Sequence, residues 1–169
     1  CSSDLWRPQQ IWRQPLGDTT RTMITNALYS HRSPTVSPDG QWIAFIADAT
    51  LRPDSVVDLE RDSLAQLPYN KVRDEAERND ADIYVMPVSG GAPRKVADWM
   101  GGEPSITRWA DGRQLAFIGR PGRTKSARLY VVDVAGGTPR NLIGDWQYEP
   151  SGFEWLADGS MFFTADIGG

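Results

Sequence analysis

The chain has very little of two residue types on which many functional sites depend. Of its 169 residues, one is cysteine, Cys1, and one is histidine, His31. A single cysteine excludes an intrachain disulfide and a zinc site built from cysteines. A single histidine leaves one imidazole for a catalytic triad. His31 precedes the expected strand 33–36, and we expect it to be a hydrogen-bonded structural residue.

Charge and hydropathy exclude further classes. The net charge is −4 and the pI is near 5.0, so the composition provides no basic face for nucleic acid. No apolar run reaches the roughly 18 residues that a membrane-spanning helix needs. His, Asp and Glu show no metal-ligand spacing, and the loop 119–125 lacks the spacing of a phosphate-binding motif. We therefore predict no metal and no cofactor.

The sequence is rich instead in residues of tight turns and of packed sheets, with 16 Gly, 12 Pro and 7 Trp. Two motifs recur along it. The first is an Asp-Gly pair before an apolar run: S-P-D-G-Q-W-I-A-F-I (37–46), W-A-D-G-R-Q-L-A-F-I (109–118) and L-A-D-G-S-M-F-F-T-A (156–165). The second is a short apolar segment: I-W-R-Q-P-L (11–16), I-Y-V-M-P-V (83–88) and L-Y-V-V-D-V (129–134).

The two motifs repeat with matching spacing. Counted from its aspartate, the first recurs after 72 and then 47 residues, and the second recurs after 72 and then 46. The longer interval is one repeat plus about 26 further residues, which lie between Asp48 and Ile83. Two independent motifs with one period predict a repeat protein.

Each repeat has the pattern of four strands. The Asp-Gly turn joins the first two strands, because glycine tolerates the positive φ of a tight hairpin. The apolar run that follows is typical of a strand covered on both faces. A polar hairpin, a third strand and a Gly-Gly turn lead to the fourth strand. Glycine and proline recur too often for paired helices, so we predict an all-β fold of propeller blades.

The motifs divide the chain into about three blade-equivalents: half a blade, two full blades and half a blade. The predicted domain, 1–169, contains blade repeats at about 1–26, 33–98, 104–143 and 150–169, and a partly helical insertion at the rim, 51–80. An open arc leaves sheet edges exposed, and a closed propeller usually has about four blades or more. We therefore expect a segment of a longer polypeptide, or two copies whose half-blades complete each other.

Some residues recur at one position of the repeat. The aromatic sets are Trp12, Tyr84 and Tyr130, and Trp42, Trp109 and Trp155. We expect both sets to pack between neighbouring sheets. Arg94 and Arg140 each follow Gly-Gly-x-Pro, which predicts a repeated surface contact or a contact between blades.

The pairing of S-P-D-G-Q-W-I-A-F with D-I-Y-V-M-P-V-S-G-G-A-P-R resembles the blade motif of TolB-like propellers. It resembles even more the N-terminal propeller of the prolyl oligopeptidase family of serine peptidases, including the acylaminoacyl-peptidase and dipeptidyl-peptidase branches. The resemblance covers nearly the whole chain. In those peptidases the propeller caps an α/β-hydrolase domain and restricts access to its Ser–Asp–His triad, whereas TolB is a periplasmic propeller that binds partner proteins.

No catalytic residue of the peptidases can be assigned to this chain. No serine has glycine both two positions before and two positions after it, so the nucleophile elbow G-x-S-x-G is absent. The resemblance therefore implies a non-catalytic segment that gates or positions peptides for a hydrolase domain outside it. The alternative is a TolB-like binding protein without enzymatic activity. Cytoplasmic and periplasmic locations both stay open, and Cys1 followed by two serines also matches the start of a bacterial lipoprotein.

The insertion 51–80 interrupts the repeat and is the predicted binding element, because loops on a rigid scaffold commonly carry function. Asp54 or Ser55 can begin a helix, which Pro68 ends. In the dipeptidyl-peptidase branch, paired glutamates on an insertion hold the amine of the substrate. Glu75 and Glu77 resemble that pair, although Ala76 separates them. These glutamates are the candidate substrate-binding residues, and a solvated helix face is the alternative for their charged segment.

Overall fold

The structure is a computed structural model that describes residues 8–27, 29–48, 66, 81–97, 102–121, 125–156 and 158–166, with Asp48 and 102–108 described by their backbone only. Within these ranges every regular element is a strand, so the all-β prediction is confirmed. The strands are β1 (Trp12–Arg13), β2 (Thr22–Met23), β3 (His31–Val36), β4 (Trp42–Asp48), β5 (Ala81–Pro87), β6 (Arg94–Ala97), β7 (Gly102–Trp109), β8 (Gln114–Arg120), β9 (Arg128–Asp133), β10 (Arg140–Asn141), β11 (Glu149–Trp155) and β12 (Met161–Asp166).

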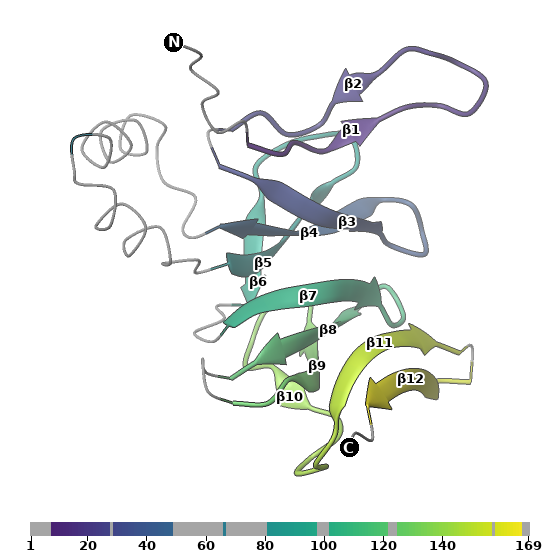
Figure 1. Ribbon diagram of the computed structural model, residues 1–169. Helices are drawn as coiled ribbons and strands as arrows, with labels where there is room; N and C mark the ends of the chain where they lie inside the picture. The colour runs from purple at the N-terminus through teal and green to yellow at the C-terminus, as the bar shows by residue number, and fades with distance from the viewer. Residues whose placement is uncertain are drawn as a thin grey trace.

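The strands form four antiparallel sheets in chain order. The first sheet is β1–β2, the second β3–β4–β5–β6, the third β7–β8–β9–β10 and the fourth β11–β12. Figure 1 shows the four sheets one below the other, from the purple N-terminal pair to the yellow C-terminal pair. Each strand pairs with its neighbour in sequence, so no connection crosses a sheet. No sheet closes on itself among the described strands.

A separate hydrophobic core fills each space between neighbouring sheets. Alternate residues of one strand point to opposite faces, so the apolar strands β4, β5, β8 and β9 each supply two cores. In β4, Ile43 and Phe45 pack toward the first sheet, whereas Ala44 packs toward the third. In β8, Leu115 and Phe117 pack toward the second sheet. The alternate β8 residues belong to the core that contains Phe153 of the fourth sheet.

The Asp-Gly pairs form the predicted turns. The glycines Gly40, Gly112 and Gly159 have φ of 71°, 82° and 83°, values that side chains rarely adopt. The preceding aspartates accept backbone N–H groups two residues ahead, from Gln41, Arg113 and Ser160, at 2.9–3.0 Å. Hydrogen bonds from Ser37 and Ser160 lower the pKa of Asp39 and Asp158, respectively. Each carboxylate thus satisfies donors that the turn would leave exposed.

Polar contacts also join the second and third sheets. The indole Nε1 of Trp109 donates to the carbonyl oxygen of Thr35 at 3.1 Å. The guanidinium of Arg94 donates to the carbonyl oxygen of Val134 at 2.6 Å. The inter-sheet contact predicted for Arg94 is therefore present. These hydrogen bonds help to orient two sheets whose contact is otherwise hydrophobic.

The hairpin of the fourth sheet differs by one residue from the sequence alignment of the repeats. The hydrogen bond that closes the turn runs from Ser37 to Trp42 in the second sheet and from Ala110 to Gln114 in the third, but from Leu156 to Ser160 in the fourth. Ser160 therefore occupies the place that Trp42 and Gln114 occupy. A shift of one residue exchanges the faces of a strand.

The exchange explains the exposure of Phe162. The sequence alignment places Phe162 with Ile43 and Leu115, which are buried, but Phe162 is 69% exposed. Met161 takes the inward position instead, opposite Trp155 in the ladder, and packs in the core between the third and fourth sheets.

The recurring aromatic residues fulfil the packing prediction in part. Tyr84 and Tyr130 are buried between sheets, as predicted, but Trp12 at the same repeat position is 56% exposed. Trp12 lies on the face of the first sheet that points away from the second sheet, where no described sheet covers it. Trp109 is also buried, and Trp155 packs in a core. Trp42 is 40% exposed, contrary to the prediction.

A matched pair of leucine substitutions tests the stacked cores. Leu115 is fully buried and Leu16 is fully exposed. We expect Leu115→Ala to lower the free energy of unfolding by about 2–5 kcal/mol, because it leaves a cavity between two sheets. Leu16→Ala should change it by less than about 0.5 kcal/mol. Urea unfolding followed by tryptophan fluorescence measures both values, and equal effects would contradict the assignment of this core.

Candidate functional site

An open cavity of about 250 Å³ lies where the third and fourth sheets meet, at the end of β8, the beginning of β11 and the end of β12. Buried Ile118, Ala127 and Pro150 give it apolar walls. The lining side chains that carry chemistry are Arg120, Glu149, Ser151 and Asp166.

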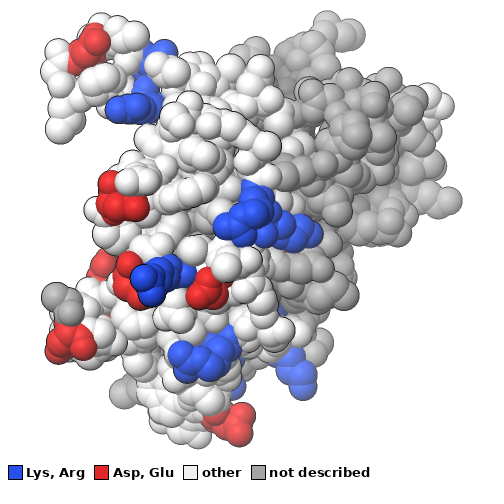
Figure 2. All heavy atoms as spheres, turned by 180° about the vertical axis from the view of Figure 1, so that it is seen from behind, with Lys and Arg blue, Asp and Glu red and all other residues white. Residues whose placement is uncertain are grey.

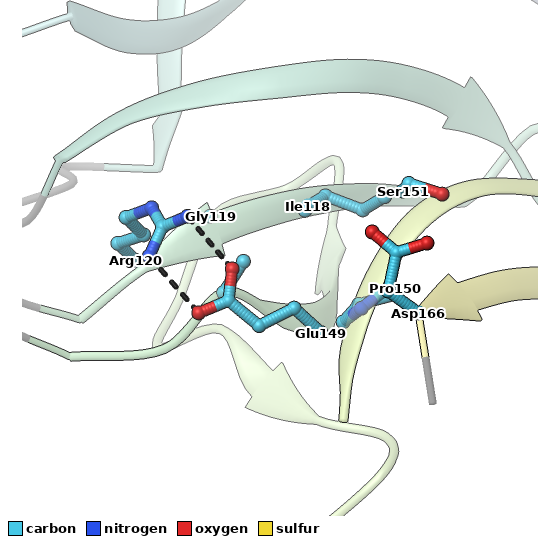
Figure 3. Close-up of a pocket in the computed structure, with 8 residues that line it drawn as sticks. Ile118, Gly119, Arg120, Glu149, Pro150, Ser151 and Asp166 are labelled. Carbon is cyan, nitrogen blue, oxygen red and sulfur yellow. Dashed lines mark hydrogen bonds and ion pairs between the residues drawn. The ribbon is translucent and has the colours of Figure 1, made fainter. Parts of the chain in front are cut away.

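Arg120 and Glu149 join the two sheets at the side of this cavity. Ile118 and Arg120 are alternate residues of β8, so both point toward the fourth sheet. The two terminal nitrogens of Arg120 donate to the two carboxylate oxygens of Glu149 at 3.1 and 2.7 Å (Figure 3). Arg120 also donates to the carbonyl oxygen of Lys125 at 3.2 Å. A bidentate pair of this kind fixes geometry as well as charge.

Hydrogen bonding from Arg120 holds the pKa of Glu149 below its ordinary value, and the charge of Arg120, the Ser126 side chain and the Ala127 backbone add to this effect. Nevertheless, the side chains of the pair are 47% and 39% exposed. Water screens a pair this exposed, so its contribution to stability is small.

Asp166 and Ser151 form the second polar part of the cavity. Asp166 lies opposite Glu149 in the β11–β12 ladder, and opposite residues share a face of the sheet. In Figure 3 the Asp166 carboxylate lies between the Arg120–Glu149 pair and Ser151. The Ser151 hydroxyl is 3.0 Å from that of Thr164. No described cation forms an ion pair with Asp166.

This arrangement suits the binding of a small cationic group better than the binding of an anion. Arg120 is already paired with Glu149, whereas Asp166 and the Ser151 hydroxyl offer oxygen atoms to a donor. The site also lacks an imidazole: the single histidine of the chain, His31, is buried in β3, with ring centroids 5.0 Å from Tyr29 and 5.1 Å from Phe45. His31 thus packs between two aromatic rings, which fits a structural residue.

The predicted binding residues Glu75 and Glu77 and the predicted helical insertion lie outside the described residues, as does Cys1. Sequence analysis did not single out Glu149, Ser151 or Asp166. One signal was available: the tripeptide Glu-Pro-Ser occurs at 103–105 and again at 149–151, near the start of the first strand of two successive sheets. The arginine that pairs with Glu149 has no counterpart for the first Glu-Pro-Ser. Arg120 ends the second strand of the third sheet, whereas Asp48 ends the second strand of the second sheet.

The described surface carries no dominant charge of one sign on the face in Figure 2, where basic and acidic side chains are interspersed. In the part of the chain that is described, no group of three or more His, Cys, Asp or Glu side chains lies close enough together to bind a metal ion. In the same part, no helix has the length and apolar character needed to cross a membrane.

Comparison with known proteins assigns no family to the chain. No protein-family model and no curated protein matches the sequence. The resemblance to propellers of the prolyl oligopeptidase family therefore rests on the repeat motifs themselves.

Substitution of Glu149 tests the contact between the third and fourth sheets. We expect Glu149→Gln to lower stability at pH 7 by at most about 1 kcal/mol, because the lost ion pair is exposed. The pKa of Glu149 is lowered in the folded protein. The stabilisation by the Arg120–Glu149 pair is therefore complete above the ordinary glutamate pKa, about 4.3, and disappears as the pH falls through the lowered pKa of Glu149.

Denaturant unfolding at pH 7, 5 and 3 measures the effect. The difference between the two proteins should be constant from pH 7 to about 5 and should shrink as the pH falls toward 3. Asp145→Asn, at an exposed position between β10 and β11, is the control. A difference that grows toward low pH would contradict the assigned role of Glu149.

Proposed function

We propose that the chain is part of a β-propeller of the prolyl oligopeptidase type, a non-catalytic segment that admits or positions short peptides for a hydrolase domain located outside this sequence. The observation that carries the proposal is the stack of four-stranded sheets. Both complete sheets have their strands in sequence order, and each sheet packs its two faces against its neighbours. Sheets of this kind, repeated around an axis, are the blades of a propeller.

The position of the insertion supports a role in peptide access. The segment 49–80 connects the end of β4 to the beginning of β5. β4 and β8 run toward the same side of the stack (Figure 1), and the cavity beside Arg120 lies at the end of β8. The last described residue before the insertion, Asp48, therefore lies on the same side of the stack as this acidic cavity. Glu75, Glu77 and Asp166 provide carboxylates for the positively charged amine of a peptide.

The residues of the chain support binding rather than catalysis. The sequence has no G-x-S-x-G motif, which the peptidase reaction needs for its nucleophile. Its histidine is packed between aromatic rings, and Ser151 interacts with Thr164. The TolB-like alternative shares the same scaffold but predicts a folded protein, and not a short peptide, as the ligand.

Peptide binding tests the proposal. A labelled tetrapeptide with a free amino terminus should bind the chain, and its acetylated counterpart should bind more weakly. We expect the double variant Glu75→Gln/Glu77→Gln to bind the free-amine peptide about fivefold more weakly, since one exposed charge interaction contributes about 1 kcal/mol. Its affinity for the acetylated peptide should not change. Fluorescence anisotropy measures both affinities.

Glu60→Gln is the matched control, because Glu60 lies in the same insertion but outside the charged segment 71–78. Its affinity for both peptides should equal that of the unchanged chain. Absence of binding by either peptide at millimolar concentration would contradict peptide gating. Capture of a folded partner protein under those conditions would then favour the TolB-like alternative.

A further inference from the structure

The first strand of each complete sheet has one edge that pairs with no other described strand. β3 ends the order β3–β4–β5–β6, and β7 ends the order β7–β8–β9–β10. In Figure 1, β3, β7 and β11 run in the same direction, one below the other, and the Trp109 side chain at the end of β7 donates to Thr35 of β3. A regular strand with such an edge is a template on which another extended chain can pair.

The hydrogen-bond pattern shows which position of β3 faces this edge. The N–H of Ser37 donates to the oxygen of Trp42 at 2.9 Å, so Trp42 bonds toward β3. Because the bonds of an antiparallel strand alternate between its two sides, Ala44 and Ile46 also bond toward β3, whereas Phe45 bonds toward β5. A regular β3 would place one residue opposite Phe45, and the backbone N–H and C=O of that residue would point to the free edge.

Instead, β3 has a bulge at this position. Its ladder shifts between Arg32 and Thr35, so two residues, Ser33 and Pro34, lie opposite the single residue Phe45. Proline has no N–H to donate. Ser33 has a φ of 51°, which a residue with a side chain rarely adopts, so the bulge forms at a conformational cost. The bulge removes a donor that a regular strand would present at its edge.

The first strand of the third sheet has the same feature in its backbone. The ladder of β7 shifts between Gly102 and Ser105, so Glu103 and Pro104 lie opposite the single residue Gly119. Counted from the hydrogen bond that closes its own turn, Gly119 bonds toward β9, and the position opposite it in β7 faces the free edge. A proline again occupies an edge-facing position.

β11 repeats the arrangement a third time. Its ladder shifts between Pro150 and Gly152, so Pro150 and Ser151 share the position opposite Ala165, which also faces the free edge by the same count. A proline within a strand is confined to edges and bulges because it cannot donate to the ladder. Its recurrence in β3, β7 and β11 therefore indicates a feature that the repeat maintains. Pro150 and Ser151 also line the candidate cavity.

A second contact covers the edge of β3 beside its bulge. Ala47 lies opposite His31 and bonds toward β5 by the same alternation, so the backbone N–H of His31 points to the free edge. That N–H donates to the oxygen of Gln9 at 2.8 Å. An extended chain that approached this half of β3 would find the His31 donor occupied and no donor on Pro34.

We propose that the proline bulges of β3, β7 and β11 prevent an extended peptide from adding to these first strands as a further strand. A regular edge binds extended peptides through their backbone, whatever their sequence. With the bulges in place, a peptide at the cavity beside Pro150 keeps its backbone unpaired, and its side chains and amine determine where it binds. This consequence for peptide access rests on the proposed function, whereas the exclusion of strands does not.

Removal of the bulge in β3 tests the proposal. Deletion of Ser33 combined with Pro34→Val leaves one residue between Arg32 and Thr35 and restores an N–H at the free edge. The probe is a labelled hexapeptide of alternating valine and threonine with both ends blocked, so that it has no charged amine. We expect this variant to bind the hexapeptide at least about fivefold more tightly than the unchanged chain, the factor for one further hydrogen bond. Fluorescence anisotropy measures both affinities.

Two variants serve as matched controls. Ser33→Gly keeps both residues of the bulge and suits the positive φ, so its affinity for the hexapeptide should equal that of the unchanged chain. Pro15→Val makes the same proline substitution in the exposed loop between β1 and β2, and it should also have no effect. Circular dichroism checks that each variant is folded. If deletion of Ser33 prevents folding, Pro34→Val alone, which restores the N–H at unchanged length, should still bind more tightly than the unchanged chain.

Equal affinity of the unchanged chain and of the folded variants that regain the N–H would overturn the proposal. Tighter binding by Ser33→Gly or Pro15→Val would overturn it as well, because neither restores a donor at the edge. The blocked hexapeptide requires no amine recognition, so this result does not depend on Glu75 and Glu77. A failure of the tetrapeptide experiment would therefore remove the role in peptide access and leave the exclusion of strands to be judged by the hexapeptide alone.

Discussion

The constraint on which this structure depends is that the central strands are buried on both faces. Phe45 and Ala44 are neighbours in one strand, yet they belong to different cores, and Phe117 and Ala116 repeat this arrangement one sheet later. A single sheet would expose one of its apolar faces to water, at about 1.5–3 kcal/mol for each large side chain. Each sheet therefore needs a neighbour on both sides, and the stacking of sheets follows from the strands themselves.

The turns control which side chain enters which core. The three Asp-Gly turns share their glycine conformation and their aspartate hydrogen bonds, but the closing hydrogen bond in the fourth sheet comes one residue earlier relative to the aspartate. This shift by one residue places Met161 in the core between the third and fourth sheets and leaves Phe162 exposed to solvent. It also brings Phe163 into the position of Phe45 and Phe117, so the aromatic position of the repeat is kept although the sequence alignment is broken.

Polar contacts between sheets are few and directional among the described residues. Trp109 and Arg94 reach backbone oxygens of the adjoining sheet, and Arg120 reaches Glu149 across the next interface. The first two contacts use backbone acceptors, which any sequence provides, whereas the third needs a particular acid at a particular place. The Arg120–Glu149 contact therefore depends on the particular side chains of one junction in the stack.

The sequence by itself determined that this protein is all-β, because Asp-Gly turns before apolar runs are local signals that each hairpin satisfies on its own. It also determined the burial of Tyr84 and Tyr130, since period and apolar pattern place them in strands covered on both faces. Only the tertiary structure decided that Trp12 is exposed and that Met161, not Phe162, is buried, because exposure depends on neighbouring sheets and on strand register. Sequence analysis did not identify the candidate cavity either: Glu149 and Asp166 lie opposite each other in the β11–β12 ladder, but Arg120 meets them only because the third and fourth sheets pack together.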